Sequence, residues 1–230
     1  MVCTLLSTVL LVMTLNEFEG IKKIMSKVDK KWIDRIVIVD GGSTDGTVEE
    51  AIKMGFEVIK QTTLNGYGGA ILTGVNATKE DNIILFSPDG NHEVEDIKKL
   101  SEKIVEDYDQ VIITRFGKNS VNLDAGLFDR FGNKMFVFLV NVIFGGNYTD
   151  TLTGCRAIKR KAMLELKIDA LAMDSTQQMS IRGLKKKQKI FEIEGNEWHR
   201  VGGKRKMRPL RVGAQLSLQI IKEFIFWKVP

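Results

Sequence analysis

The sequence predicts an α/β protein built on a mostly parallel sheet with helices on both of its faces. Short apolar runs rich in valine and isoleucine alternate, through the first half of the 230 residues, with stretches of helical period. These runs are apolar at almost every position, as in strands that are buried on both faces. Crossovers between parallel strands are right-handed, so the loops that follow the strands gather at one edge of the sheet.

The individual elements follow from these runs in chain order. The expected strands cover residues 9–12, 35–40, 56–60, 82–86 and 110–114, and the expected helices cover 20–28, 48–54, 70–77 and 94–105. In the second half, the run MFVFLVNVIF (135–144) is apolar and of helical length, and is either a core helix or a wall that faces lipid. Residues 189–194 alternate like a strand, and 213–227 predict a final amphipathic helix.

Length and composition limit the domain organisation. With 43% hydrophobic residues the chain can bury one substantial core, so we expect one domain or one domain with an appendage. Cys3 and Cys155 lie far apart and form no CxxC pair, which favours reduced thiols in a cytoplasmic protein. The apolar stretch 5–13 lacks a basic flank and is far shorter than the ~20 residues of a membrane span, so we assign it to the first strand.

The net charge of +5 is concentrated in one stretch. Residues 185–211 hold ten lysines and arginines against three glutamates, whereas the rest of the chain is close to neutral. A local basic field favours a phosphate-bearing partner, which could be a nucleotide, a lipid head group or nucleic acid. The stretch lacks an aromatic stacking pattern or a known module, so we expect no nucleic-acid partner.

Two glycine-rich segments are candidate ligand loops. In VDGGSTDGT (39–47), Asp40 ends a strand, and its carboxylate could accept hydrogen bonds from a ribose or a base, or could simply shape the turn. GYGG (66–69) does not complete a GxGxxG motif, and no Walker lysine follows a glycine pair. Dinucleotide and P-loop functions therefore lack support, as do hydrolase and zinc functions, since GxSxG, HExxH and paired cysteines are absent.

The turn SPDGNH (87–92) is the candidate metal site. Asp89 at the strand end could bind Mg²⁺ or Mn²⁺, Asn91 could add a carbonyl oxygen, and nucleotide phosphates could complete the coordination. His92 more often packs or caps than binds metal at such a place. The turn carries only one carboxylate on its own strand end, which predicts a weakened metal site.

A basic loop near the C-terminus is the third candidate. In WHRVGGKRKM (198–207), Arg200, Lys204 and Lys206 flank the pair Gly202–Gly203. Such a loop could fold over a diphosphate and neutralise the charge that develops when it departs. The alternative is a solvated basic loop without a ligand.

These segments occur in an order that resembles the family 2 glycosyltransferases, and within them the dolichyl-phosphate mannose synthase-like, or polyprenyl-phosphate glycosyltransferase, branch. The matching segments span nearly the whole chain: TLNEFEGI (14–21), IVIVDGGSTDGT (36–47), NGYGGAILTG (65–74), SPDGNHEVEDI (87–97), ITRFG (113–117), DTLTGCRAIKR (150–160) and RVGGKRKM (200–207). The resemblance implies a GT-A fold, with a Rossmann-like sheet, and an inverting transfer of sugar from GDP-mannose or a UDP-sugar to a polyprenyl or dolichyl phosphate.

The resemblance also implies roles for individual residues. Asp89 and Arg200 would be catalytic, and Asp89 and Asn91 would hold Mg²⁺ or Mn²⁺. Residues expected to bind the donor or to meet phosphates are Leu15, Glu17, Asp40, Gly66, Arg115, Arg130 and Lys204. A phosphate acceptor is largely anionic at neutral pH because its second pKa lies near ~6, so a general base is dispensable.

The chain departs from the family pattern at four positions. Ser87 replaces the first aspartate of the family's DxD motif, Lys134 sits near an expected serine, Arg205 stands where a serine is common, and Gln177 lies where many members carry an acid. Two alternatives stay open. One is a family 2 glycosyltransferase with a non-lipid acceptor, and the other, which Ser87 suggests, is a nucleotide-sugar-binding protein with little turnover.

The expected organisation is a glycosyltransferase domain over residues 1–210 and a C-terminal amphipathic helix over 211–230. Leu216, Ile220, Phe224 and Trp227 would form one helical stripe that either enters a membrane interface or packs on the core. We expect a cytoplasmic protein, peripheral on the cytoplasmic face of a membrane. A separate membrane subunit or a homo-oligomer remains open.

Overall fold

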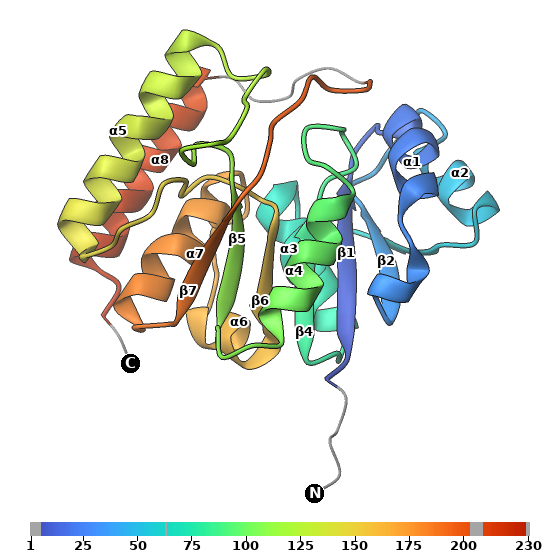
Figure 1. Ribbon diagram of the computed structural model, residues 1–230, viewed down its shortest axis with the longest axis horizontal. Coiled ribbons are helices and arrows are strands. Elements are labelled where there is room, and N and C mark those ends of the chain that lie inside the picture. Colours follow the sequence, from blue (N-terminus) through green and yellow to red (C-terminus); the bar gives the residue numbers. More distant parts are fainter. Residues whose placement is uncertain (1–5, 63, 203–208, 229–230) are drawn as a thin grey trace, which may run out of the picture.

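The computed structural model of the protein describes residues 6–62, 64–202 and 209–228, and these form an α/β fold around one seven-stranded sheet (Figure 1). The strands are β1 (Thr8–Thr14), β2 (Arg35–Asp40), β3 (Glu57–Lys60), β4 (Asn82–Phe86), β5 (Gln110–Thr114), β6 (Arg156–Lys159) and β7 (Ile190–Glu194). The helices are α1 (Phe18–Ile24), α2 (Thr47–Lys53), α3 (Gly66–Ala77), α4 (Glu95–Ile104), α5 (Leu127–Phe144), α6 (Arg160–Leu166), α7 (Asp174–Lys185) and α8 (Pro209–Ile225).

The sheet is mostly parallel, as expected. Its strand order is β3-β2-β1-β4-β6-β5-β7, and only β6 runs antiparallel to its two neighbours. We did not predict β6, since it is short and its alternation is weak. The six parallel strands all end at the upper edge in Figure 1, so the loops that follow them meet there.

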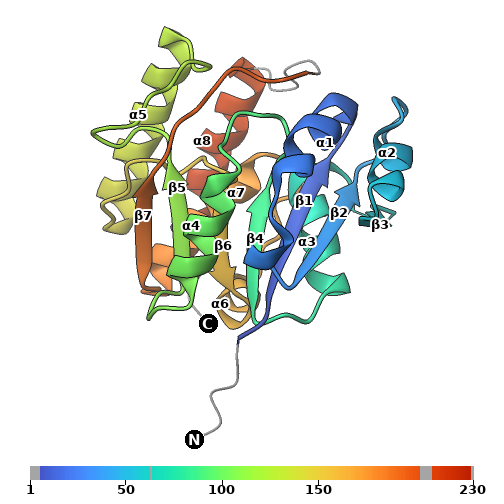
Figure 2. The ribbon, with the colours of Figure 1, turned by 45° about the vertical axis from the view of Figure 1, so that its right-hand side comes forward.

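Helices cover both faces of the sheet, which confirms the predicted architecture (Figure 2). All seven residues of β1 are buried, and they alternate between the two sides. Leu10 and Val12 pack toward α1 and α4, whereas Val9 and Leu11 pack toward α3, α6 and α7. The continuous apolar run at the start of the chain is therefore a central strand.

Helices α5 and α8 lie side by side beyond the β5–β7 end of the sheet (Figure 1). Phe136 and Val140 of α5 pack with Leu216 and Ile220 of α8 in a small apolar cluster. A buried ion pair also fastens α8 to α7, because Arg182 Nε donates to both oxygens of Glu223 at 2.9 and 3.0 Å. The C-terminal helix is therefore an integral part of the packing.

Two predictions about these helices need correction. The predicted stripe on α8 does not stay on one face: Leu216 and Ile220 are core residues, whereas Phe224 is 66% exposed. Each step of four residues turns a helix about 40° beyond a full turn, so the stripe drifts off the core. The run 135–144 is the second half of a longer helix that buries Phe136 and exposes Phe138. Among the described residues, no helix combines the length and apolar character needed to cross a bilayer.

Candidate functional site

The candidate site lies at the carboxyl ends of β1, β2 and β4. Residues 14–17 begin with the last residue of β1, residues 40–46 begin with the last residue of β2, and residues 87–92 follow β4. A fourth segment, residues 195–202, leaves β7 and returns over the same edge; we call it the closing segment. Open α/β sheets bind ligands at this edge, where backbone groups are not used by the sheet.

The first two loops are locked together by hydrogen bonds. Asn16, which adopts a left-handed conformation at φ 52°, accepts a bond from the Thr44 backbone N–H at 2.8 Å and donates its own N–H to the Ser43 hydroxyl at 2.8 Å. Asp40 accepts the backbone N–H groups of Gly42 and Ser43, each at 2.9 Å, and is only 1% exposed. In the structure Asp40 therefore shapes the loop. Its contact with a ribose or base stays a prediction.

A guanidinium group links the other two segments. Arg200 Nη1 donates to Asp89 Oδ2 at 2.8 Å, and Arg200 Nη2 donates to Glu17 Oε1 at 2.7 Å. Burial raises the pKa of the Asp89 carboxyl, and the nearby Arg200 charge opposes that rise. The structure thus brings together three of the predicted site residues, with Leu15 39% exposed beside Glu17.

The closing segment is bound to the Asp89 turn through its backbone. The N–H of Val201 donates to the carbonyl of Asp89, and the N–H of Trp198 donates to that of Asn91, both at 2.9 Å. Asn91 Nδ2 returns a bond to the Trp198 carbonyl at 2.6 Å. Gly90 has φ 85°, and a Cβ there would lie 2.6 Å from Val201 Cγ1, so glycine permits the close approach.

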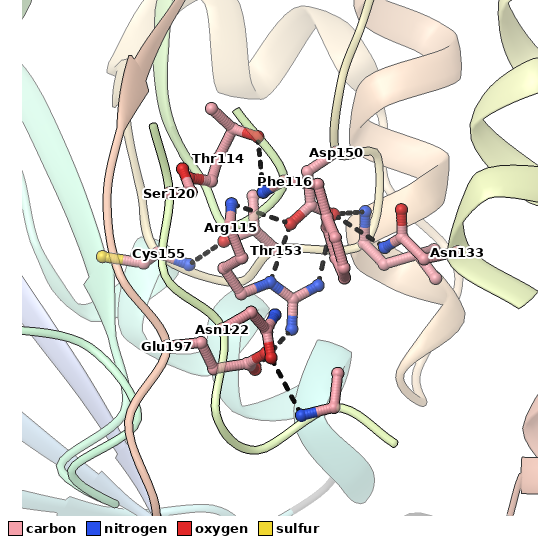
Figure 3. A network of polar contacts seen from close by, with 12 residues as sticks. Thr114, Arg115, Phe116, Ser120, Asn122, Asn133, Asp150, Thr153, Cys155 and Glu197 are labelled. Atoms are coloured by element: carbon pink, nitrogen blue, oxygen red, sulfur yellow. Dashed lines mark hydrogen bonds and ion pairs between the residues drawn. The ribbon is translucent and has the colours of Figure 1, made fainter. Parts of the chain in front are cut away.

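Arg115 lies at the centre of a polar network that ties β5 to the closing segment (Figure 3). Its Nε donates to Asp150 Oδ2 at 2.7 Å and its Nη1 to Glu197 Oε1 at 2.8 Å. Asn133 and Asn122 donate to the same two carboxylates. Burial alone would lower the pKa of Arg115, but the two carboxylates outweigh it and raise that pKa. Two carboxylates already bind the Arg115 guanidinium, so a phosphate would have to bind it alongside them. Phosphate binding by Arg115 stays a prediction.

Three predicted residues remain, namely Arg130, Gly66 and Lys204. Arg130 is exposed on α5, where its Nε donates to the Ala125 carbonyl at 3.0 Å. Gly66 opens α3 at φ 85°, and a Cβ there would lie 2.5 Å from the Leu171 carbonyl oxygen, so its observed role is to admit that loop. Lys204 lies outside the described residues. Phosphate or donor contacts for all three stay predictions.

Two titratable groups beneath the site are neutral at neutral pH. Burial raises the pKa of Tyr67 to about 12 and lowers the pKa of His92 to about 3. His92 is 9% exposed, which agrees with a packing role. A Cβ at Gly154 would lie 2.3 Å from the Tyr67 hydroxyl oxygen, so glycine there makes room for the phenol. Sequence reasoning assigned no role to Tyr67, because an aromatic residue in a glycine-rich turn has many uses.

A divalent cation would depend on ligand oxygens as well as protein oxygens. Among residues 6–62, 64–202 and 209–228, no three histidine, cysteine, aspartate or glutamate side chains are placed to hold a metal ion together. The Asp89 carboxylate is nevertheless 85% buried and has the oxygen chemistry that Mg²⁺ and Mn²⁺ prefer. The residues therefore fit a cation that shares its coordination with a diphosphate.

The sheet order and the loops at its carboxyl edge define a GT-A fold, the fold of many sugar-transferring enzymes. A family model described as Glycosyl transferase family 2 matches residues 10–166, and the chain belongs to that family. This finding confirms the family predicted from the sequence motifs and makes the protein a glycosyltransferase.

The comparisons with individual proteins agree with this family. The chain is 27% identical over 211 residues to glycosyltransferase AglJ of Haloferax volcanii, covering 91% of this chain and 69% of the relative. It is 29% identical over 211 residues to a dolichyl-phosphate hexose transferase of the same organism, covering 91% and 90%. The structure resembles glucosyl-3-phosphoglycerate synthase from Mycobacterium tuberculosis in complex with Mn²⁺, UDP and phosphoglyceric acid. That match has a TM-score of 0.77 and 18% identity, and it covers 97% of this chain and 80% of the other, so it supports the fold alone.

Proposed function

We propose that this protein transfers a sugar from a nucleoside-diphosphate sugar to a polyprenyl or dolichyl phosphate. The observation that carries the proposal is the junction of Asp89, Glu17 and Arg200 at the carboxyl edge of a GT-A sheet. Relatives named for dolichyl-phosphate transfer support the acceptor class. The sugar and the base, for which GDP-mannose and UDP-sugars are the candidates, would be set by loops that the donor contacts.

In this proposal Asp89 and Asn91 hold the divalent cation with oxygens of the donor diphosphate. The cation, when bound, supplies positive charge to the diphosphate that leaves the sugar. Ser87 in place of a second carboxylate leaves the cation more dependent on the diphosphate. Asp40, Leu15 and Glu17 border the nucleoside in this proposal, and Gly66 also contacts the donor.

The chain's own residues perform the remaining tasks by position and charge. Arg200, carried by the closing segment, neutralises the departing diphosphate, together with Lys204, which follows four residues later in the sequence. In this proposal Arg130, which is exposed at the start of α5, binds the acceptor phosphate, for which a planar guanidinium is well suited. Arg115 contacts Asp150 and Glu197. In this proposal these contacts orient the loop before α5, to which Arg130 is hydrogen-bonded.

An apolar surface on α5 and α8 favours a lipid acceptor over a small one. Each of its members is at least half exposed: Leu127, Phe128, Phe131, Phe138, Val142, Leu210, Leu218, Ile221, Phe224, Ile225 and Phe226. A groove of about 370 Å³ opens along α8 next to Asp174 at the start of α7, and its lining includes Leu218, Ile221 and Phe226 of this surface. Exposed apolar patches of this kind mark membrane or partner contacts.

Charge agrees with a membrane contact. Arg130 and Lys134 on α5 and Arg211 on α8 lie among the apolar residues, as in helices that rest on anionic lipid surfaces. We therefore propose peripheral attachment through the α5–α8 surface, on the cytoplasmic face of the membrane. We propose this surface for the membrane contact in place of the helical stripe predicted from the sequence, because Leu216 and Ile220 of that stripe belong to the core.

The membrane contact is tested by sedimentation with anionic and neutral vesicles. Wild type should pellet with anionic vesicles, and Phe128→Ser combined with Phe131→Ser should reduce this binding without changing the unfolding temperature. Ile52→Ser on α2, a residue of similar exposure at 60%, is the matched control and should bind as wild type does. Equal binding of all three proteins would mean that Phe128 and Phe131 do not contact the membrane. A concentration-dependent dimer that is lost in the Phe variant would assign the surface to a second copy of the chain.

The acceptor is tested by release of nucleoside diphosphate. We expect release from a GDP- or UDP-sugar only when polyprenyl phosphate is added, and none with 3-phosphoglycerate or water. A second candidate is the non-lipid acceptor that the sequence left open, and a protein of the same fold is named for a small phosphorylated one, as glucosyl-3-phosphoglycerate synthase. Release with 3-phosphoglycerate but not with polyprenyl phosphate would favour that candidate.

A further inference from the structure

Glu17 and Asp89 both form ion pairs with Arg200. The two carboxylates come from different strand ends, are 8% and 15% exposed, and are bridged by the guanidinium of Arg200. Two carboxylates brought together in a site of low exposure repel each other unless a cation lies between them. Arg200 therefore supplies a cation at the turn where Asp89 would bind a divalent one.

Arg200 is held less completely than the other arginine of the site. All three nitrogens of the Arg115 guanidinium donate to carboxylate oxygens. Arg200 Nε, in contrast, is buried and has no hydrogen-bond partner within the described part of the chain. A buried, unpaired N–H weakens the case for Arg200 as a purely structural group, because such a donor costs free energy until it finds an acceptor.

We propose that Arg200 competes with the divalent cation for Asp89 and gives way when a diphosphate binds. Phosphate oxygens accept bidentate bonds from a guanidinium, and they offer more acceptors than the two carboxylates do. Nucleotide and metal then bind cooperatively: the diphosphate draws Arg200 away from Asp89, and the cation occupies the position that Arg200 leaves. By linkage, each ligand raises the affinity for the other.

This inference rests on the proposed function for the identity of the diphosphate. The competition itself does not require sugar transfer, so it is measured by metal binding rather than by activity. Electron paramagnetic resonance of free Mn²⁺ reports binding directly, with protein-free samples correcting for Mn²⁺ held by the nucleotide alone. The proteins compared are wild type, Arg200→Gln and Arg35→Gln, whose arginine pairs with Glu57 and Glu80 at the opposite end of β2.

We expect Arg200→Gln to bind Mn²⁺ in the absence of nucleotide about tenfold more tightly than wild type, because the internal competitor is gone. Adding GDP or UDP should tighten Mn²⁺ binding to wild type by about tenfold, and should do so less for Arg200→Gln. Arg35→Gln should match wild type in both conditions.

Two results would overturn the inference. One is a folded Arg200→Gln that binds Mn²⁺ alone no more tightly than wild type. The other concerns wild type alone and does not depend on how the variant folds: Mn²⁺ affinity that is the same with and without GDP and UDP. Failure of the proposed function would give a different result: Arg200 would compete with Mn²⁺, but no sugar would be transferred to any acceptor.

Discussion

The two halves of the carboxyl edge are held together by different kinds of bond. On the β1–β2 side, the loops at 14–17 and 40–46 are joined mainly by backbone N–H groups and short polar side chains, as in the bond from Thr44 to Asn16. On the β5–β7 side, full charges meet in a buried environment, where Arg115 contacts Asp150 and Glu197. The first half is a local arrangement of loops, and the second is an ion-pair network across the fold.

This difference indicates which positions of the site tolerate substitution. A neutral hydrogen bond contributes about 1 kcal/mol, so losing one weakens a loop. Removal of one partner from a buried ion pair leaves an uncompensated charge, which costs about 3–5 kcal/mol. We therefore expect single substitutions around Arg115 to disturb folding, and single substitutions in the β1–β2 loops to act mainly on the donor side.

The largest effect on stability should come from Asp150→Asn. Asp150 is completely buried and accepts two bonds from the Arg115 guanidinium, so its neutralisation should lower the free energy of unfolding by about 3 kcal/mol. Chemical denaturation followed by circular dichroism measures this loss. The control is Asp107→Asn, which breaks the exposed pair with Lys189 and should leave the midpoint unchanged. Equal effects of the two variants would mean that the Arg115 network does not hold the site together.

The next largest effect concerns Asp89. Asp89→Ala should lower the rate of sugar transfer at least about a hundredfold, because a charge that organises the diphosphate is lost. Ser87→Asp should act in the opposite sense on the metal and tighten Mn²⁺ binding in the presence of nucleotide. Full activity of Asp89→Ala, together with activity that EDTA does not change, would remove Asp89 from the metal site.

The positions of the residues on the β1–β4 side of the carboxyl edge could be predicted from the sequence better than the contacts on the β5–β7 side, for a physical reason. Asp40 and Asp89 stand at the ends of apolar strand runs, and strand ends can be recognised locally. Asp150 and Glu197 lie 35 and 82 residues from Arg115, so no local pattern shows that these charges meet. The strand β6 was missed because four residues carry too little periodicity, and the start of α5 because polar and apolar residues are mixed before residue 135.

A smaller effect is expected for Asp40→Asn. The carboxylate accepts two backbone N–H groups, and an amide keeps only one oxygen to accept them, so we expect a loss of about 1–2 kcal/mol in unfolding free energy. Nucleotide affinity should fall in the same variant, since the loop that borders the nucleoside loosens. Thermal unfolding with and without GDP or UDP separates the two losses. A stability loss as large as that of Asp150→Asn would contradict the claim that the β1–β2 loops contribute less to stability than the Arg115 network.

The smallest effect is a pH dependence of the Arg115 network. Burial opposes ionisation of Asp150, but Arg115 outweighs it and lowers the pKa of that carboxyl from its ordinary value of 3.8. A carboxyl whose pKa is lower in the folded state stabilises the fold above its unfolded pKa, and this stability is lost as the pH falls through the folded value. The stability difference between wild type and Asp150→Asn should therefore be constant from pH 7 to about 5 and shrink below about pH 4. Denaturation curves at four pH values in this range measure it, and a difference that grows in acid would contradict the network.

The central claim, sugar transfer to a polyprenyl phosphate at the Asp89–Arg200 junction, is tested most directly by mass spectrometry of the lipid product. Purified protein is incubated with anionic vesicles that contain polyprenyl phosphate, a panel of GDP- and UDP-sugars, and Mn²⁺. We predict a glycosylated polyprenyl phosphate with one donor for wild type, and none for Asp89→Ala. Absence of any lipid-linked sugar with wild type across the panel, or equal product from Asp89→Ala, would contradict the claim.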